Sequence, residues 1–431
     1  MTNFFKKNSS YILIGITFIC IYLLIHARPL TTPNSINSDG YGYYAYLPSI
    51  LIHNQFAIAN PTQFAPDQPI LDYPTFIYHP EANSYLNKYP PGTAILLLPS
   101  FIVAVLLSFL LQLPIDGYNP VFQHTIGITT SLFATSGIYF MYQIANRVTN
   151  TTTAKLSIIA IIAGTSFTTY TVYAPTFSHI YSLALTSAFI YLTLSPNSRS
   201  SRKQLSILGI LWGLLTLTRN TNILIILFWI IYQLFQQGKY QPSLSNLKLI
   251  IKPLAIISII AIPIITIQPT YQYLSVEAIP ILSYSQEGFN WMDPAWYGVL
   301  FSPRRGLFFW APILYLCLIS LTQILKPPRW AIPSAIYIAI QTYIIASWHQ
   351  WWFGDSYGHR AFIDLYPFFI LFLAQGFQKM WKKRPTQIAA ISFLIICIVI
   401  NTILTIQWWI GNLYHDNTFT HNVIRALLFW R

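Results

Sequence analysis

The sequence predicts an all-α, polytopic membrane bundle. Of its 431 residues, 54% are hydrophobic and only 8% are charged, whereas a soluble globular protein carries roughly a quarter charged residues. The mean hydropathy is +0.50. Long apolar segments recur along the whole chain, each near the length that crosses a bilayer core about 30 Å thick. We therefore expect a single integral-membrane domain over 1–431, with 12 or 13 transmembrane helices.

The first apolar segment, from about 11 to 25, follows Lys6 and Lys7 and is predicted to be an uncleaved anchor. The segment 28–92 is rich in Pro, Asn and Tyr. Its apolar patch, 43–52, is too short to span and predicts a helix lying at the membrane interface. Further spans are predicted at 93–113, 123–145, 155–172, 178–195, 205–218, 221–237, 249–268, 307–325, 331–347, 362–378 and 387–409.

Basic residues predict the orientation. Six short stretches hold 16 of the 24 Lys and Arg residues and no Asp or Glu, and we place them in the cytoplasm: 1–9, 146–155, 196–204, 238–252, 326–330 and 379–386. The polar segments 28–92, 269–306 and 348–361 then face outward, together with a tail at 410–431. The net charge of +13 is thus a topology signal and does not indicate nucleic-acid binding.

One region conflicts with this orientation. If 93–113 and 123–145 each cross once, Arg147 and Lys155 emerge on the outer side, against the rule. The basic stretches and the large outer segment agree only if one crossing here is hidden, split or re-entrant.

The three cysteines, Cys20, Cys317 and Cys397, lie inside apolar runs, so neither a disulfide framework nor a metal cluster is expected. The sequence contains no Walker motif and no HExxH, which argues against a nucleotide-driven pump. No cofactor is expected.

Asp39 is the strongest candidate for chemistry. It lies in Ser38-Asp39-Gly40-Tyr41 just after the first span, and an acid at a membrane mouth is a functional candidate. An N-cap for an interfacial helix is the alternative explanation. Tyr43 beside it is a candidate substrate contact.

Eight cations lie outside the cytoplasmic stretches: Arg28, Lys88, Arg219, Arg304, Arg305, Arg360, Arg425 and Arg431. We assign Arg28, Arg425 and Arg431 to lipid headgroups. Lys88 and the Arg304–Arg305 pair stand next to Pro and Gly just before a span, which favours binding of a phosphate; Arg360 is a further candidate for it.

Four more residues are candidate substrate contacts: His179, Arg219, His349 and Asp355. His179 at an outer turn equally fits a histidine satisfied inside the bundle. Asp355 and Asp364 flank Arg360 and can simply pair with it. The spacing of His349, Asp355 and His359 matches no metal-ligand pattern.

These motifs in this order resemble the GT-C superfamily of integral-membrane glycosyltransferases, in particular the bacterial branch related to protein O-mannosyltransferases and lipid A aminoarabinose transferases. The resemblance covers about 38–367. It is carried by Asp39 early in the first outer loop, by Lys88-Tyr89-Pro90-Pro91 before the next span, and by the later stretches 302–310 and 351–360.

The resemblance implies interfacial helices in the first outer loop and an active site at the outer face of the plasma (inner) membrane. It implies a hexosyl or pentosyl transferase that takes its sugar from a polyprenyl-phosphate donor and gives it to a cell-envelope glycan, lipid or protein. Asp39 would then be the general base or acceptor-positioning acid, and Lys88 would contact the donor phosphate, with Arg304, Arg305 and Arg360 similar to phosphate-binding arginines. The chain departs from the pattern where Gly40 replaces a second acid and where Tyr89 precedes the two prolines.

Two other functions remain open. A transporter or flippase for an anionic lipid-linked substrate would also need outer arginines, but it should show internal repeats and charge at mid-membrane depth. An O-antigen ligase or polymerase would depend on arginines in a large late outer loop, where this chain has Arg304 and Arg305.

Overall fold

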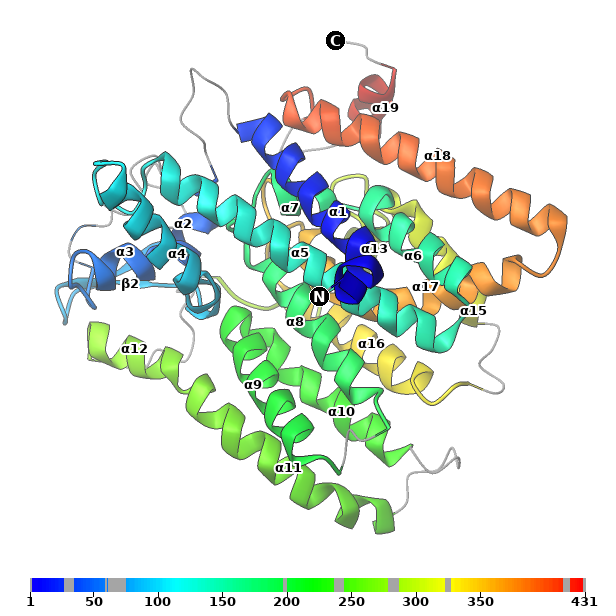
Figure 1. Cartoon of the computed structure of the whole chain (residues 1–431), viewed down its shortest axis with the longest axis horizontal. Helices are drawn as coiled ribbons and strands as arrows, with labels where there is room; N and C mark the ends of the chain where they lie inside the picture. The colour runs from blue at the N-terminus through cyan, green and yellow to red at the C-terminus, as the bar shows by residue number, and fades with distance from the viewer. Residues whose placement is uncertain are drawn as a thin grey trace.

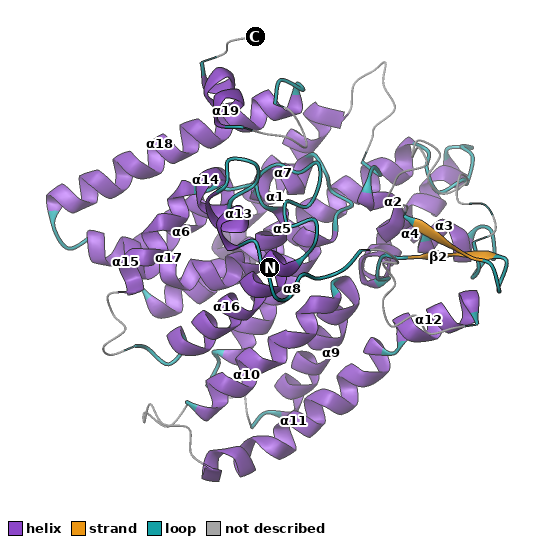
Figure 2. Cartoon of the chain, turned by 180° about the vertical axis from the view of Figure 1, so that it is seen from behind, coloured by secondary structure: helices purple, strands orange, loops and turns teal. Residues whose placement is uncertain are grey.

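The computed structural model describes residues 2–26, 35–58, 60, 75–196, 200–235, 244–277, 287–321, 327–413 and 419–428. Within these residues the chain is a bundle of helices with one small hairpin (Figures 1 and 2). The predicted fold class is therefore confirmed. Of the residues discussed above, Arg28 and Arg431 lie outside the described part of the chain.

The first half of the chain contains eleven helical elements and both strands. They are α1 (Thr2–His26), α2 (Asp39–Tyr44), α3 (Tyr46–Leu51), β1 (Phe76–His79), β2 (Ser84–Asn87), α4 (Gly92–Leu110), α5 (Pro120–Val148), α6 (Thr151–Gly164), α7 (Phe167–Val172), α8 (Ser178–Thr193), α9 (Arg202–Thr218), η2 (Asn220–Leu224) and α10 (Ile225–Leu234).

The second half continues with α11 (Leu244–Ile265), α12 (Ile267–Val276), α13 (Trp296–Phe301), α14 (Leu307–Trp310), η3 (Pro312–Tyr315), α15 (Leu316–Leu321), α16 (Ala331–Ser347), η4 (Arg360–Leu365), α17 (Tyr366–Met380), α18 (Arg384–Trp409) and α19 (Thr420–Leu427).

Every predicted span coincides with helix, but several are interrupted. The span expected over 155–172 is divided into α6 and α7, and the one over 307–325 into α14, η3 and α15, where Pro312 opens η3 because proline cannot donate the helical hydrogen bond. Among the described residues, four helical stretches are both long and apolar enough to cross a membrane: 92–110, 248–276, 360–380 and 384–409. The expected number of 12 or 13 spans therefore stays a prediction.

The interfacial helix expected at 43–52 is present as two short helices, α2 and α3. They lie beside an antiparallel hairpin in which Phe76 pairs with Asn87 and His79 with Ser84, at one edge of the bundle (Figure 2). The sequence does not predict this hairpin, because its two strands are only four residues long.

The contacts of α4 bear on the conflict around residues 93–155. Gly92, which opens α4, packs against the backbone of Leu217 at the end of α9. The loop after α4 returns to the first loop, where the Tyr44 hydroxyl donates to the carbonyl of Gly117 at 2.5 Å. The start of α4 and the loop that follows it therefore both contact the Asp39 side of the bundle, as a re-entrant segment would. Whether α4 crosses the membrane stays a prediction, because its length and composition allow a crossing.

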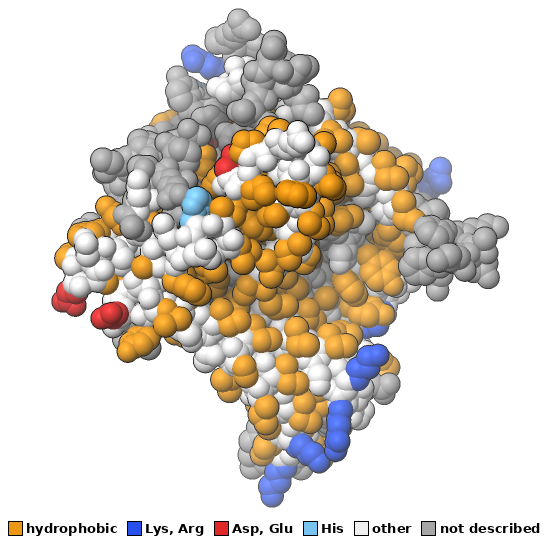
Figure 3. Space-filling view, turned by 60° about the vertical axis from the view of Figure 1, so that its left-hand side comes forward, with side chains coloured by type: hydrophobic (Ala, Val, Ile, Leu, Met, Phe, Trp, Pro, Cys, Tyr) orange, Lys and Arg blue, Asp and Glu red, His pale blue; other side chains and the backbone are white. Residues whose placement is uncertain are grey.

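The opposite side gathers the ends that carry the basic stretches. Tyr11 of α1 contacts Tyr139 of α5 at 5.1 Å between ring centroids, and Arg147 at the end of α5 lies 3.8 Å over the ring of Tyr191. Gln204 at the start of α9 donates to the carbonyl of Leu192. In Figure 3 most of the visible Lys and Arg side chains accordingly lie well away from the acidic ones, with a broad apolar surface between them.

Helix α17 is the centre of the bundle. Its first nine residues, 366–374, are apolar and all buried, as expected of a helix enclosed by others, whereas Gln375, Gln378 and Lys379 lie near its end. The helices α4, α11 and α18 leave most of their apolar side chains exposed, which suits contact with lipid. Because η4 leads directly into α17, the polar residues of η4 are held against the rigid core.

Candidate active site

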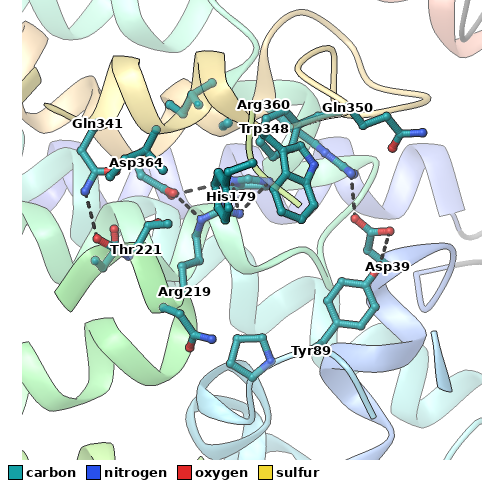
Figure 4. A pocket seen from close by; sticks show the side chains of 18 of the residues that line it. Asp39, Tyr89, His179, Arg219, Thr221, Gln341, Trp348, Gln350, Arg360 and Asp364 are labelled. Atoms are coloured by element: carbon teal, nitrogen blue, oxygen red, sulfur yellow. Dashed lines mark hydrogen bonds and ion pairs between the residues drawn. The ribbon is translucent and has the colours of Figure 1, made fainter. Parts of the chain in front are cut away.

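A cavity of about 530 Å³ opens on the Asp39 side of the bundle. Its walls come from α2, the turn before α4, the first turn of α8, η2, residues 287–291, the end of α16 with the loop that follows, and η4. Figure 4 shows Asp39 and Tyr89 at one end of the group and Asp364, Arg219 and Gln341 at the other. Five of the predicted site residues besides Asp39 line it: Tyr43, Lys88, His179, Arg219 and Arg360.

Asp39 is held by two partners from distant parts of the chain. Arg360 Nη2 lies 2.8 Å from Asp39 Oδ2, and the Tyr89 hydroxyl donates to Asp39 Oδ1 at 2.7 Å. Burial by itself would raise the pKa of Asp39, but the Arg360 charge, the Tyr89 hydrogen bond and the Lys88 charge outweigh it and lower the pKa. Asp39 is therefore ionised at neutral pH, with a fixed orientation.

The backbone before Asp39 is strained. Ser38 has a φ of 47°, a left-handed conformation that costs a non-glycine residue of order 1–3 kcal/mol and that is concentrated at functional sites. The carbonyl of Asn37 accepts from Gly40 N at 2.8 Å and closes the turn that opens α2. Asp39 begins α2 but is not its cap, so the N-cap explanation does not account for it.

Two glycines of the motif pack closely against neighbouring side chains. A Cβ on Gly40 would lie 2.5 Å from Thr176 Oγ1, and a Cβ on Gly42 would lie 2.1 Å from Cδ2 of Tyr89. A side chain at position 40 would therefore collide with Thr176. Gly42 in turn leaves the space in which the Tyr89 ring reaches Asp39.

Tyr43 completes this end of the cavity. Its ring packs against Tyr89 at 4.7 Å between centroids, and its hydroxyl hydrogen-bonds with Ser178. Burial raises the pKa of Tyr43, so the phenol keeps its proton and serves as a hydrogen-bonding group.

The far end of the cavity is a second charged cluster. Arg219 Nε lies 2.7 Å from Asp364 Oδ2, and Arg219 Nη1 lies 3.2 Å from His179 Nδ1. His179 Nδ1 is 3.7 Å from Asp364 Oδ1. Asp364 therefore pairs with Arg219 and not with Arg360, the partner that its place in the sequence suggested.

Lys88 forms the third ion pair. Its Nζ lies 2.5 Å from Glu287 Oε1, and the two side chains are only 5% and 10% exposed. The partners are 199 residues apart. The pair lies in the same cavity as Asp39.

Solved structures share this architecture. ArnT from Cupriavidus metallidurans, bound to undecaprenyl phosphate, matches 98% of this chain and 70% of its own length, with a TM-score of 0.53 and 13% identity. AglB from Archaeoglobus fulgidus, an archaeal oligosaccharyltransferase in complex with an inhibitory peptide and a dolichol-phosphate, matches 99% of this chain and 54% of its own length, with a TM-score of 0.51 and 12% identity. An oligosaccharyltransferase from the same archaeon, in complex with Zn and sulfate, matches 91% of this chain with a TM-score of 0.52 and 14% identity.

This chain has the GT-C fold. The resemblance inferred from the motifs is thereby confirmed at the level of the fold. No protein-family model matches the chain, and no curated protein matches it in sequence. The chain spans about half the length of the oligosaccharyltransferase structures, so identities of 12–14% carry the fold and not the substrates.

In this GT-C fold the arginine pair lies apart from the cavity lining. Arg304 stacks on the ring of Trp352, its guanidinium carbon 3.6 Å from the ring centroid. Arg305 is buried, and it donates from Nε to Ser356 Oγ at 3.2 Å and from Nη1 to the carbonyl of Arg304 at 2.6 Å. The role of both in binding phosphate stays a prediction, whereas their contacts shown here hold the 348–360 loop.

His349 and Asp355 also lie outside the lining. His349 Nδ1 accepts from the backbone of Gly288 at 3.3 Å, which ties the 287–291 segment to the end of α16. Asp355 is exposed. In the same loop, burial and the nearby Arg305 and Arg360 charges lower the pKa of His359 to about 3, despite a hydrogen bond with the backbone of Trp351 that raises it. The part of the chain that the structure describes contains no group of three His, Cys, Asp or Glu side chains placed to hold a metal ion.

Sequence reasoning did not select three of the residues that shape the cavity. In the sequence, Tyr89 stands out only as an insertion in the lysine motif. Glu287 has no distinguishing spacing, and Gln341 lies inside a predicted span. Gln341 donates from Nε2 to the carbonyl of Thr221 at 3.0 Å, as Figure 4 shows. A polar amide in an otherwise apolar span is the one signal that could have indicated it.

Proposed function

We propose that the chain is a glycosyltransferase that moves a sugar from a polyprenyl-phosphate donor to a cell-envelope acceptor. The observation that carries this proposal is the oriented, ionised Asp39 in a cavity that also contains Lys88, Arg219 and Arg360. Glycosyl transfer from a lipid phosphate needs an acid–base group for the acceptor hydroxyl and cations for the leaving phosphate. ArnT and AglB, which share the fold, were solved with polyprenyl phosphates.

The reaction balances with the groups present. The acceptor oxygen forms a bond to the sugar C1 while the bond from C1 to the donor phosphate oxygen breaks and its electron pair leaves with the phosphate. The acceptor proton passes to the Asp39 carboxylate. The phosphate gains one negative charge, which Lys88 and Arg360 are placed to stabilise.

The lowered pKa of Asp39 makes it a weak base before bond formation. We infer that it first accepts a hydrogen bond from the acceptor hydroxyl and takes the proton late, when the oxygen has become acidic through bonding to C1. The other two carboxylates of the cavity, Glu287 and Asp364, are paired with Lys88 and Arg219, so we infer a single displacement with inversion at C1 and no carboxylate nucleophile.

The distribution of basic residues indicates which side of the membrane the active site faces. The cavity lies on the side opposite the basic stretches, which we assign to the cytoplasm. The active site would then face the outer side of the plasma (inner) membrane, where the acceptors would be cell-envelope glycans, lipids or proteins. The sugar can be a hexose or a pentose.

The test compares wild type with Asp39→Asn in lipid vesicles, using a panel of radiolabelled polyprenyl-phosphate sugars and a membrane extract as acceptor. We expect label to leave the carrier with wild type and to stay on it with the variant, a loss of about 100- to 10,000-fold. Asp293→Asn is the matched control, because Asp293 is an exposed carboxylate outside the cavity lining and should transfer normally.

Other results would contradict the proposal. Transfer by Asp39→Asn at the wild-type rate would exclude Asp39 as the acid–base group. If wild type and variant both bind labelled donor and move none of it, a transporter or flippase becomes the better explanation.

A further inference from the structure

The charges of the cavity are balanced. The described lining contains three Lys or Arg residues and three Asp or Glu residues, and they form three pairs: Asp39–Arg360, Glu287–Lys88 and Asp364–Arg219. A phosphate that enters adds negative charge to a site where each cation already has a carboxylate within 2.5 to 2.8 Å. Tight binding therefore requires that one carboxylate give up its cation.

Two of the three carboxylates are held in place by more than one group. Asp39 accepts from Tyr89 as well as Arg360. Asp364 lies in η4, beside both Arg219 and His179, and η4 is continuous with the buried helix α17. Moving either carboxylate would break two contacts at once.

Glu287 differs from them. Among the described residues its side chain forms one ion pair, with Lys88, and this side chain is one carbon longer than that of aspartate. The chain after it is anchored, since His349 N donates to the carbonyl of Gly288 at 3.0 Å and Asn290 N donates to that of Ser347 at 2.6 Å. Because Glu287 lines the cavity of about 530 Å³, its side chain has room to rotate away from Lys88 while the backbone stays in place.

We propose that Glu287 occupies the position on Lys88 that the donor phosphate takes, and that it competes with that phosphate. This inference rests on the proposed function, because it concerns a phosphate-bearing polyprenyl lipid in the same cavity. Phosphate oxygens replace the carboxylate on the Lys88 ammonium, and Glu287 turns away from Lys88 within the cavity. After transfer, Glu287 pairs with Lys88 again and helps the polyprenyl phosphate leave.

The competition predicts the direction in which the Kd for undecaprenyl phosphate changes when Glu287 loses its charge. Glu287→Gln keeps the shape and polarity of the side chain and removes the charge that neutralises Lys88. We expect the variant to bind undecaprenyl phosphate about tenfold more tightly than wild type, the change in Kd that corresponds to about 1.4 kcal/mol. The gain should disappear in the Lys88→Gln/Glu287→Gln double variant, which lacks the cation.

The experiment measures the Kd of undecaprenyl phosphate for the full chain in nanodiscs, with uncharged undecaprenol as the reference lipid. Glu277→Gln is the matched control, because Glu277 is exposed at the end of α12 and its substitution makes the same change in net charge. Its Kd should equal that of wild type. If Glu287→Gln does not fold, Glu287→Asp shortens the reach to Lys88 and should tighten binding by a smaller factor.

Three results distinguish a failure of the Glu287 competition from a failure of the proposed function. Equal or weaker binding by Glu287→Gln, with wild type binding the phosphate, would overturn the competition and leave the proposed function standing. Tightening by Glu277→Gln to the same extent would overturn it as well, because the effect would be one of net charge. If wild type does not distinguish undecaprenyl phosphate from undecaprenol, the proposed function fails, and this inference fails with it.

Discussion

Replacing Arg360 with glutamine should move the acid limb of the pH–activity profile to higher pH. Arg360 Nη2 lies 2.8 Å from Asp39 Oδ2, and its charge is the strongest of the influences that lower the pKa of Asp39. Two unit charges about 4 Å apart interact by about 4 kcal/mol at an effective dielectric constant of about 20. The cost of burying both charges offsets part of this energy.

The direction in which the acid limb moves follows from the reaction's need for Asp39 in its carboxylate form. A lowered pKa keeps Asp39 ionised, and wild type active, below the ordinary carboxyl pKa of 3.8. Without Arg360 the burial of Asp39, which raises its pKa, is opposed only by Tyr89 and by weaker charges. The variant should therefore lose activity at a higher pH than wild type as the medium is acidified.

The assay is the initial rate of label transfer at saturating donor, from about pH 3 to about pH 8, with samples returned to pH 7 to verify that the loss is reversible. Donor saturation separates this effect from any loss of phosphate affinity. Arg219→Gln is the control, because Arg219 lies in the same cavity but pairs with Asp364. An acid limb that stays in place in Arg360→Gln, or moves equally in both variants, would refute the role of the Asp39–Arg360 pair.

Three further predictions concern the residues around this pair. Tyr89→Phe removes the hydroxyl at 2.7 Å from Asp39, a hydrogen bond to a charged group worth about 1.5–3 kcal/mol; the acid limb should move upward without loss of folding, and an unchanged limb would contradict this. Gly42→Ala places a Cβ against the Tyr89 ring and should lower stability by about 1–3 kcal/mol, measured as thermal unfolding in detergent, with wild-type stability as the contrary result. Asp364→Asn leaves Arg219 without its carboxylate and should cost about 3–5 kcal/mol; a cost below 1 kcal/mol in the same melt would show that the pair is solvated.

Much of the fold was predictable because it depends on composition along the chain. Apolar segments of spanning length identify helices without knowledge of their neighbours. For the same reason the short apolar patch 43–52 predicted the interfacial helices α2 and α3. The hairpin of β1 and β2 was not predictable, since four-residue strands leave little pattern.

The positions and partners of the polar groups were harder to predict from the sequence than the helices. The conflict around residues 93–155 could be detected from charge, but only the structure shows that the start of α4 and the loop after it both contact the Asp39 side. Arg360 was expected to pair with an acid near it in the sequence. In the structure it pairs with Asp39, more than three hundred residues away, because η4 and α2 meet at the cavity.

By itself the sequence determined the helical membrane class and the asymmetry of the basic stretches, and it selected Asp39 and Lys88 as candidate site residues, because each of these depends on residue type and on the order of segments. Only the tertiary structure decided which cation pairs with which carboxylate, that Tyr89 orients Asp39, and that Arg304 and Arg305 lie apart from the cavity lining. Those facts depend on contacts between side chains that are 50 to more than 300 residues apart in the sequence. The physical reason is that helix packing around α17, and not local spacing in the sequence, determines where such side chains meet.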